Sequence, residues 1–152
     1  MANLKIVKFG DETLRKVCRP VDEITPKVIR LLDDMIETMR TANGCGLAAP
    51  QVGVLRRIAV IEVEEGLVYE LINPKIIAYS GEQKETEGCL SNPGKWGITK
   101  RPMAVTVRAM DRYGKEYELN GKGLLARAIC HEVDHLDGKL YTDVQIQTVE
   151  ED

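Results

Sequence analysis

The two histidines of the chain have the type and spacing that metal chemistry requires. His131 and His135 are four positions apart with Glu132 between them, and no other histidine occurs in the 152 residues. Four residues advance an α-helix by about 400°, so both imidazoles project from one face and can share one ion. Glu132 is rotated by about 100° from His131, which favours contact with a water on that ion over direct coordination. Chance spacing of two unrelated histidines is the alternative to this helical metal site.

The two histidines need a third ligand, because a catalytic metal site usually has three protein ligands and one open position. No third histidine exists, which excludes the metzincin pattern. The glutamates after His135 lie only in the polar tail, so a thermolysin-like ligand from a later helix is also missing from the sequence. The third ligand must therefore come from upstream.

The chain has four cysteines without a Cys-x-x-Cys pair, which favours reduced thiols over a disulfide framework. Cys130 projects about 100° away from its neighbour His131 and cannot easily bind the same ion. Cys18 lies in an N-terminal arm, and Cys45 lies in a glycine-rich loop that would hold a ligand less firmly. Cys89, between two predicted strands, is the best candidate, although a buried inert thiol is the alternative. A thiolate with two imidazoles suits Fe(II), Zn(II), Co(II) or Ni(II).

Two helices and several short strands must position these groups. Residues 1–24 predict an irregular arm, after which Thr25 is a suitable N-cap, Pro26 suits the first helical position, and apolar residues recur at helical spacing to about Arg40. The helix that bears the histidines is expected to begin near 121–123 and to end at Gly138. Strands are predicted in two hairpins and one further segment: 57–63 with 69–72, 103–110 with 115–119, and 75–79. The polar tail at 148–152 is expected to fray.

Length and composition set the class of protein. A chain of 152 residues, 43% hydrophobic and 30% charged, is the size and composition of one soluble globular domain. Its net charge of −3 offers no basic field for nucleic acid. The N-terminus lacks an apolar run with a cleavage site, and no segment approaches about 18 uninterrupted apolar residues. We therefore expect a cytoplasmic protein that binds neither membranes nor nucleic acid.

Three stretches resemble the signature motifs of the bacterial peptide deformylases, in the same order and at similar separations. They are Gly-Cys-Gly-Leu-Ala-Ala-Pro-Gln at 44–51, Glu-Gly-Cys-Leu-Ser at 87–91 and His-Glu-Val-Asp-His-Leu at 131–136. The resemblance covers essentially the whole chain. It implies one catalytic domain over 1–152 with an α+β fold, in which antiparallel β-sheets surround a central metal-binding helix and an N-terminal helix packs against them.

The resemblance also implies a reaction, the removal of the formyl group from the N-terminal formyl-methionine of new polypeptides. One divalent ion would be Fe(II) in the native enzyme and often zinc, nickel or cobalt in preparations. The implied ligands are Cys89, His131 and His135. Glu132 would accept a proton from the water in the fourth position, and the Gln51 side-chain amide with the Leu90 backbone N–H would stabilise the oxyanion.

Helical spacing suggests one wall of a substrate pocket. Leu124 and Arg127 precede His131 by seven and four residues and share its face. Arg127 could equally be a structural charge paired with Glu87. The residues expected to shape the pocket for the first side chain, methionine in the family, are Gly44, Cys45, Gly46, Glu87, Leu124 and Arg127. Asp134 could orient a ligand histidine and is not assigned to the site.

One position departs from the family pattern. The residue before the first histidine is often glutamine, and here Cys130 adds a second thiol with an oxidation liability. The expected partners are N-formylmethionyl peptides and nascent chains, with a transient ribosome contact. Two rival hypotheses are a metalloprotease that cuts internal peptide bonds and a binding module with a structural metal.

Overall fold

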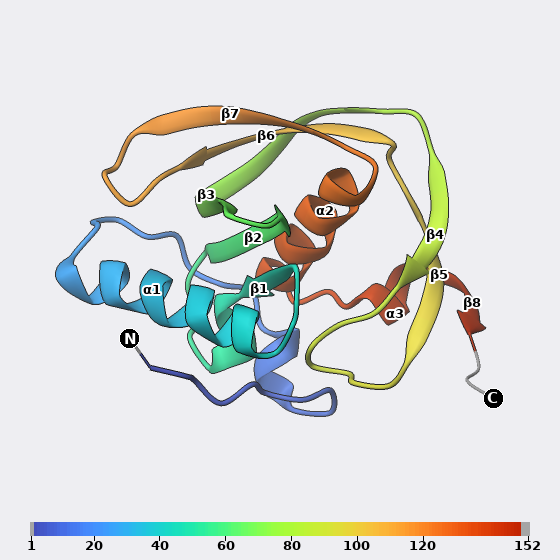
Figure 1. Cartoon of the computed structure of the whole chain (residues 1–152), viewed down its shortest axis with the longest axis horizontal. Helices are drawn as coiled ribbons and strands as arrows, with labels where there is room; N and C mark the ends of the chain where they lie inside the picture. Colours follow the sequence, from blue (N-terminus) through green and yellow to red (C-terminus); the bar gives the residue numbers. More distant parts are fainter. Residues whose placement is uncertain (1, 150–152) are drawn as a thin grey trace.

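The computed structural model describes residues 2–149 of the chain (Figure 1). Its elements follow one another in an order that mixes helices and strands. They are η1 (Glu12–Arg15), α1 (Pro26–Thr41), β1 (Gly46–Ala48), η2 (Ala49–Val52), β2 (Ile58–Glu64), β3 (Leu67–Ser80), β4 (Gln83–Glu87), β5 (Trp96–Arg101), β6 (Ala104–Met110), β7 (Glu116–Lys122), α2 (Leu124–Leu136), α3 (Tyr141–Val144) and β8 (Gln145–Val149). Within residues 2–149, no helix is both long and apolar enough to cross a membrane.

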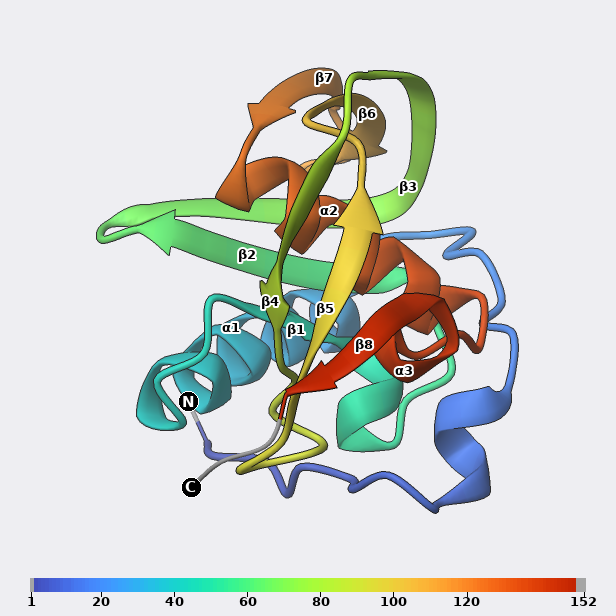
Figure 2. The same ribbon diagram turned by 90° about the vertical axis from the view of Figure 1, so that its right-hand side faces the viewer.

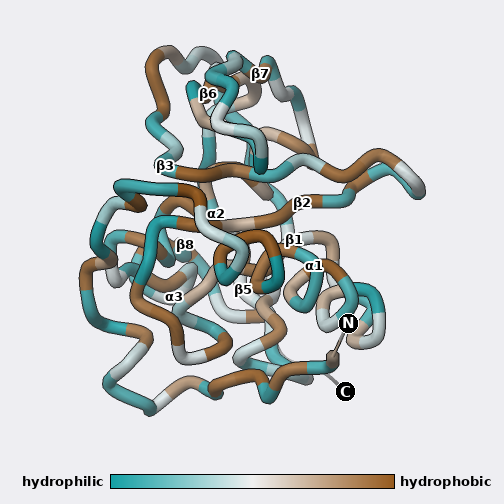
Figure 3. The backbone as a smooth tube through the Cα atoms, turned by 90° about the vertical axis from the view of Figure 1, so that its left-hand side faces the viewer, coloured by the Kyte–Doolittle hydropathy of each residue, from teal (hydrophilic) through white to brown (hydrophobic). Residues whose placement is uncertain are grey.

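The larger sheet is antiparallel and has five strands in the order β1-β2-β3-β6-β7. Successive side chains of a strand point to opposite faces, and β2 is buried on both. Ile58 and Val60 pack in the core on the α1 side, whereas Ala59 and Ile61 pack in the core on the α2 side. The sheet therefore lies between the two long helices, and Figure 3 shows the hydrophobic stretches of β2 and β3 at this place.

The smaller sheet has the order β4-β5-β8 and lies beside α2 (Figure 2). Its strands are polar, and β4 buries only its first and last residues, Gln83 and Glu87. The amide of Gln83 donates to the carbonyl oxygens of Pro102 and Gly123, each at 2.9 Å. Because Gly123 directly precedes α2, these bonds set the position of β4 relative to the start of that helix.

The predicted α+β class with antiparallel sheets is confirmed, and so are both long helices and both hairpins. Thr25 caps α1 by accepting a hydrogen bond from Val28 N–H, and α2 ends before Gly138, whose φ is +74°. Residues 75–79, expected as a separate strand, are instead part of β3. Asn73, with φ of +52°, takes up the break at Asn-Pro as an irregularity within the strand.

Two expectations about the chain ends need revision. The arm over 1–24 is irregular where it is described, except that η1 forms one 3-10 turn. The prediction that the tail frays is wrong for Thr148 and Val149, because both belong to β8 and pair with Gly97 and Trp96. Residues 150–152 lie outside the described part of the chain. The mostly polar sequence of β8 does not indicate a strand, because β8 is an edge strand that pairs, within the described residues, with β5 alone.

Candidate metal centre

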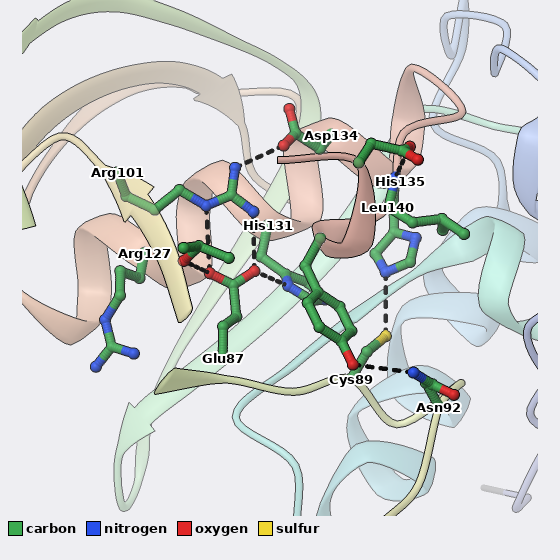
Figure 4. A network of polar contacts seen from close by, with 12 residues as sticks. Glu87, Cys89, Asn92, Arg101, Arg127, His131, Asp134, His135 and Leu140 are labelled. Atoms are coloured by element: carbon green, nitrogen blue, oxygen red, sulfur yellow. Dashed lines mark hydrogen bonds and ion pairs between the residues drawn. The ribbon is translucent and has the colours of Figure 1, made fainter. Parts of the chain in front are cut away.

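The donor atoms of Cys89, His131 and His135 lie within 4.8 Å of one another. Cys89 Sγ is 3.3 Å from His135 Nε2, and the two imidazole rings are 4.9 Å apart at an angle of 68° (Figure 4). Both histidines are buried on α2, whereas Cys89 follows the end of β4. The predicted set of ligands is therefore brought together from two distant parts of the chain.

A buried polar network fixes the first histidine (Figure 4). His131 Nδ1 lies 2.6 Å from Glu87 Oε2, and Arg101 donates to both oxygens of Glu87, at 3.2 and 2.8 Å. Arg101 also donates to Asp134 Oδ2 at 2.7 Å, and Thr99 donates to Glu87 Oε1 at 2.8 Å. Burial raises the pKa of Glu87, but the hydrogen bonds from His131 and Arg101 outweigh it and lower the pKa to about 2. Glu87 is therefore a carboxylate that holds His131 in one orientation.

The second histidine has a different environment. Burial, followed by the neighbouring charge of His131, lowers the pKa of His135 well below its usual value. A neutral imidazole is the form that binds a metal. His135 is thus kept in its ligating form at neutral pH.

Glu132 is buried beside the donor atoms. Its Oε1 atom has no hydrogen-bond partner among the described residues. Burial raises the pKa of Glu132 to about 7, although the charge of His131 opposes the shift. A Cβ atom added at Gly46 would overlap Glu132 Oε2, so the missing side chain of Gly46 creates the space that this carboxylate occupies. Glu132 therefore has the burial, the free acceptor and the pKa of a group that exchanges protons near neutrality.

Gln51 has a fixed orientation close to the thiol. Its side-chain oxygen accepts a hydrogen bond from Ala48 N–H at 2.9 Å, and its amide nitrogen donates to Ser91 Oγ at 3.1 Å. The same nitrogen lies 3.4 Å from Cys89 Sγ. Because the oxygen is occupied by backbone, the amide nitrogen is the atom that faces the donor set. Leu90, which directly follows Cys89, fills the space left by the missing side chain of Gly44.

A cavity of about 430 Å³ opens beside Glu132 and His131. It is lined by all six residues that the sequence assigns to a substrate pocket: Gly44, Cys45, Gly46, Glu87, Leu124 and Arg127. The suggested pairing of Arg127 with Glu87 does not occur. Arg127 Nη1 instead donates to the carbonyl oxygen of Thr86 at 2.9 Å, while Arg101 occupies the carboxylate of Glu87.

The extra thiol at Cys130 lies away from this cavity. Cys130 is buried in the hydrophobic core on the α2 side. Burial raises its pKa to about 11, so it is a poor nucleophile at neutral pH. The oxidation liability expected for this residue is therefore small, and the exposed Cys45, which lines the cavity, is the more accessible thiol.

Sequence reasoning did not find Thr99, Arg101 and Tyr141, which all contact residues of this site. Thr99 and Arg101 lie on the buried face of β5 together with Gly97. None of these three residues is hydrophobic, so no hydrophobic period marks that face in the sequence. Tyr141, which stacks on His131, lies in a helix of one turn that has too few residues for a helical period.

Metallohydrolases of the His-Glu-x-x-His type combine such donors with a neighbouring carboxylate and an open cavity, and this chain falls in that class. More narrowly, the chain belongs to the polypeptide deformylase family, whose family model matches residues 3–151.

Curated relatives and solved structures agree with this assignment. A peptide deformylase from Acetivibrio thermocellus is 57% identical over 152 residues, which are 100% of this chain and 89% of the relative. One from Agathobacter rectalis is 59% identical over 134 residues, 88% of this chain and 84% of the relative. The crystal structure of a peptide deformylase from Synechococcus elongatus in complex with actinonin has a TM-score of 0.91 and 39% identity. It is matched over 93% of this chain and 80% of that chain.

Proposed function

We propose that this protein is a hydrolase that removes the formyl group from the N-terminal formyl-methionine of newly made polypeptides and releases formate. The observation that carries the proposal is the convergence of Cys89, His131 and His135 beside the buried Glu132. Membership of the polypeptide deformylase family supports it, as does the full-length similarity to curated peptide deformylases.

The proposed cofactor is one divalent ion held by Cys89, His131 and His135. One thiol sulfur and two imidazole nitrogens suit Fe(II), which we propose as the native ion, and also Zn(II), Ni(II) and Co(II). The bond from His131 Nδ1 to Glu87 leaves Nε2 for the ion. The unpartnered Oε1 of Glu132 supports the fit, because a water held beside these donor atoms would satisfy it. When bound, the ion supplies positive charge that lowers the pKa of water and polarises a carbonyl.

Glu132 moves the protons of the reaction. Its carboxylate accepts a proton from the water that attacks the formyl carbonyl and delivers it to the departing amine nitrogen. The raised pKa, about 7, suits a group that must both take and give a proton at neutral pH. Gly46 contributes by leaving room for this carboxylate.

Two hydrogen-bond donors stabilise the negative charge that develops on the formyl oxygen. We assign them to the Gln51 side-chain amide nitrogen and to the backbone N–H of Leu90. The bond from Ala48 N–H to the Gln51 oxygen supports this role, because it prevents the amide from presenting its acceptor instead. A donor fixed before the reaction needs no reorganisation during it.

The methionine side chain of the substrate enters the cavity beside Glu132. Gly44, Cys45 and Gly46 form one side, and Leu124 and Arg127 of α2 form another. Glu87 shapes the cavity indirectly, because its carboxylate is occupied by Arg101 and His131. The substrates are formylmethionyl peptides and nascent chains, so we further propose a cytoplasmic protein that acts as one catalytic domain and contacts the ribosome transiently.

A peptide assay tests the function directly. Anaerobically purified protein loaded with Fe(II) should release formate from formyl-Met-Ala-Ser and leave the acetylated peptide intact. The products are separated by chromatography, so that internal cleavage is seen as well. Internal cleavage without formate would favour a metalloprotease, and bound metal with neither reaction would favour a structural site.

A further inference from the structure

The ring of Tyr141 is packed against the first histidine of the site. The Tyr141 side chain is buried, and its ring centroid lies 6.1 Å from that of His131 with the planes inclined by 20°. The ring of Phe9, from the N-terminal arm, lies 5.8 Å from that of Tyr141 at an angle of 42°. Aromatic pairs attract at these separations. Tyr141 therefore joins His131 to the N-terminal arm through a column of three rings.

The hydroxyl of Tyr141 contacts a different element, the segment 89–95, which we call the ligand loop because it begins at Cys89. The hydroxyl accepts a hydrogen bond from Asn92 Nδ2 at 2.9 Å and donates to the carbonyl oxygen of Lys95 at 3.3 Å. Asn92 N–H in turn donates to the carbonyl oxygen of Cys89 at 2.9 Å. The hydroxyl thus restrains the loop at two points, one of them bonded directly to Cys89.

Tyr141 is itself held in place. It is the first residue of α3, where Asp143 accepts a hydrogen bond from Leu140 N–H at 2.9 Å and forms an ion pair with Arg15. The ligand loop forms no helix or strand around Cys89, so it is held by contacts with other elements, which also include the bonds from Phe9 N–H to the Ser91 carbonyl oxygen at 2.8 Å and from the Gln51 amide to Ser91 Oγ at 3.1 Å. The position of the thiol therefore depends on contacts that the loop makes with its surroundings.

We propose that Tyr141 is a positioning residue that keeps the ligand loop in register with α2, so that the thiol and the two imidazoles meet at one point. Its ring acts on His131 and its hydroxyl acts on Cys89 through Asn92 and Lys95. The effect is on the retention of the ion, since ligands held by outer contacts lose less of their order when they bind. This inference rests on the metal site proposed above.

The test compares two tyrosine hydroxyls in protein loaded with Co(II). Tyr141→Phe keeps the ring and removes the hydroxyl. Tyr117→Phe makes the same change on β7, where the hydroxyl donates to the carbonyl oxygen of Glu70. An excess of chelator removes Co(II), and the loss of the thiolate-to-cobalt absorption band measures the rate of release. This rate should be about fivefold higher for Tyr141→Phe than for wild type. Tyr117→Phe should match wild type.

A double-mutant cycle shows whether the hydroxyl acts through the loop. Asn92→Ala should also increase the rate of Co(II) release. The double variant with Tyr141→Phe should release Co(II) little faster than the faster single variant, because both substitutions remove the same hydrogen bond between Asn92 and the Tyr141 hydroxyl. The inference would be overturned if Tyr141→Phe released Co(II) at the wild-type rate, or if the effects of the two substitutions on the release free energy were fully additive. Wild-type protein without a thiolate-to-cobalt band would instead overturn the metal site itself.

Discussion

His131 Nδ1 lies 2.6 Å from Glu87 Oε2, and Arg101 holds the same carboxylate from a neighbouring strand. The bond fixes which nitrogen of the imidazole carries the proton, because a carboxylate accepts and Nδ1–H must donate. The orientation of His131, a proposed metal ligand, is therefore decided on β4 and β5, outside the helix on which it lies.

Replacing Glu87 should weaken both the metal site and the fold. In Glu87→Gln, Arg101 loses one of its two carboxylate partners and keeps Asp134, so the unfolding free energy should fall by less than the roughly 3–5 kcal/mol that an unpaired buried charge costs. The affinity for a divalent ion should fall about 10–100-fold, because His131 is no longer oriented. Chelator competition and urea unfolding measure the two effects, and Glu85→Gln, exposed on the same strand, is the control. Wild-type ion affinity in Glu87→Gln would contradict this role.

Replacing Glu132 should separate chemistry from metal binding. Glu132→Gln keeps the shape of the side chain but cannot accept a proton, so formate release should fall about 100- to 10,000-fold. Ion content, measured by elemental analysis, should stay at the wild-type level, because the proposed ligand set does not include Glu132. Glu118→Gln, on β7, serves as the matched control for activity. Loss of the ion from Glu132→Gln would show that the carboxylate coordinates it.

Replacing Cys89 should remove the ion. Cys89→Ala leaves only two imidazole donors, which is one fewer than a catalytic site of this type needs. The metal content after dialysis should drop to a small fraction of wild type, while Cys130→Ala should retain the ion because that thiol packs in the core. Full occupancy in Cys89→Ala would exclude this residue from the ligand set.

A methyl group at position 46 should disturb Glu132 alone. In Gly46→Ala the added Cβ overlaps Glu132 Oε2, so the carboxylate must move and formate release should fall at least about tenfold. In a Glu132→Gln background the same change should cost much less, because the proton-transferring group is already absent. Equal losses in the two backgrounds would mean that Gly46 acts on the substrate instead.

The ion pair between Arg40 and Glu62 should make a part of the stability depend on pH. The bidentate bond from Arg40, followed by Gly66 N–H, lowers the pKa of Glu62 from 4.5 to about 2. A lowered pKa means that this stabilisation is complete above pH 4.5 and is lost as the pH falls through about 2. The melting temperature of wild type should therefore exceed that of Glu62→Gln above pH 4.5, with the gap closing below it. A gap that is constant with pH would reject the assignment.

The sequence predicts the parts of the fold that have a strong period. Thr25 and the apolar residues after it identify α1, and the spacing of His131 and His135 identifies α2. It does not predict β4, because a strand of Gln-Lys-Glu-Thr-Glu has no hydrophobic face and is held by pairing with β5 and by Gln83. The sequence does not predict β8 for the same reason, since its polar residues are held by pairing with β5, which is distant in the chain.

The candidate site divides in a similar way. Residues that belong to short motifs, such as Cys89 and Glu132, can be found from their spacing and from the resemblance of those motifs to a family. Arg101 and Tyr141 cannot, because each acts through contacts with residues distant in the sequence, Glu87 and His131, that only the folded chain brings together. The roles of such residues depend on burial and geometry, which a single sequence does not contain.

The loop that carries Cys89 and the helix that carries its partners are made at different times. Translation produces Cys89 before α2, and Tyr141 emerges later still. Contacts between such distant segments form late in folding. Until then the thiol has neither an imidazole nearby nor a restrained loop around it, and it is open to oxidation. A reducing environment during synthesis therefore favours molecules in which the three donors can still assemble.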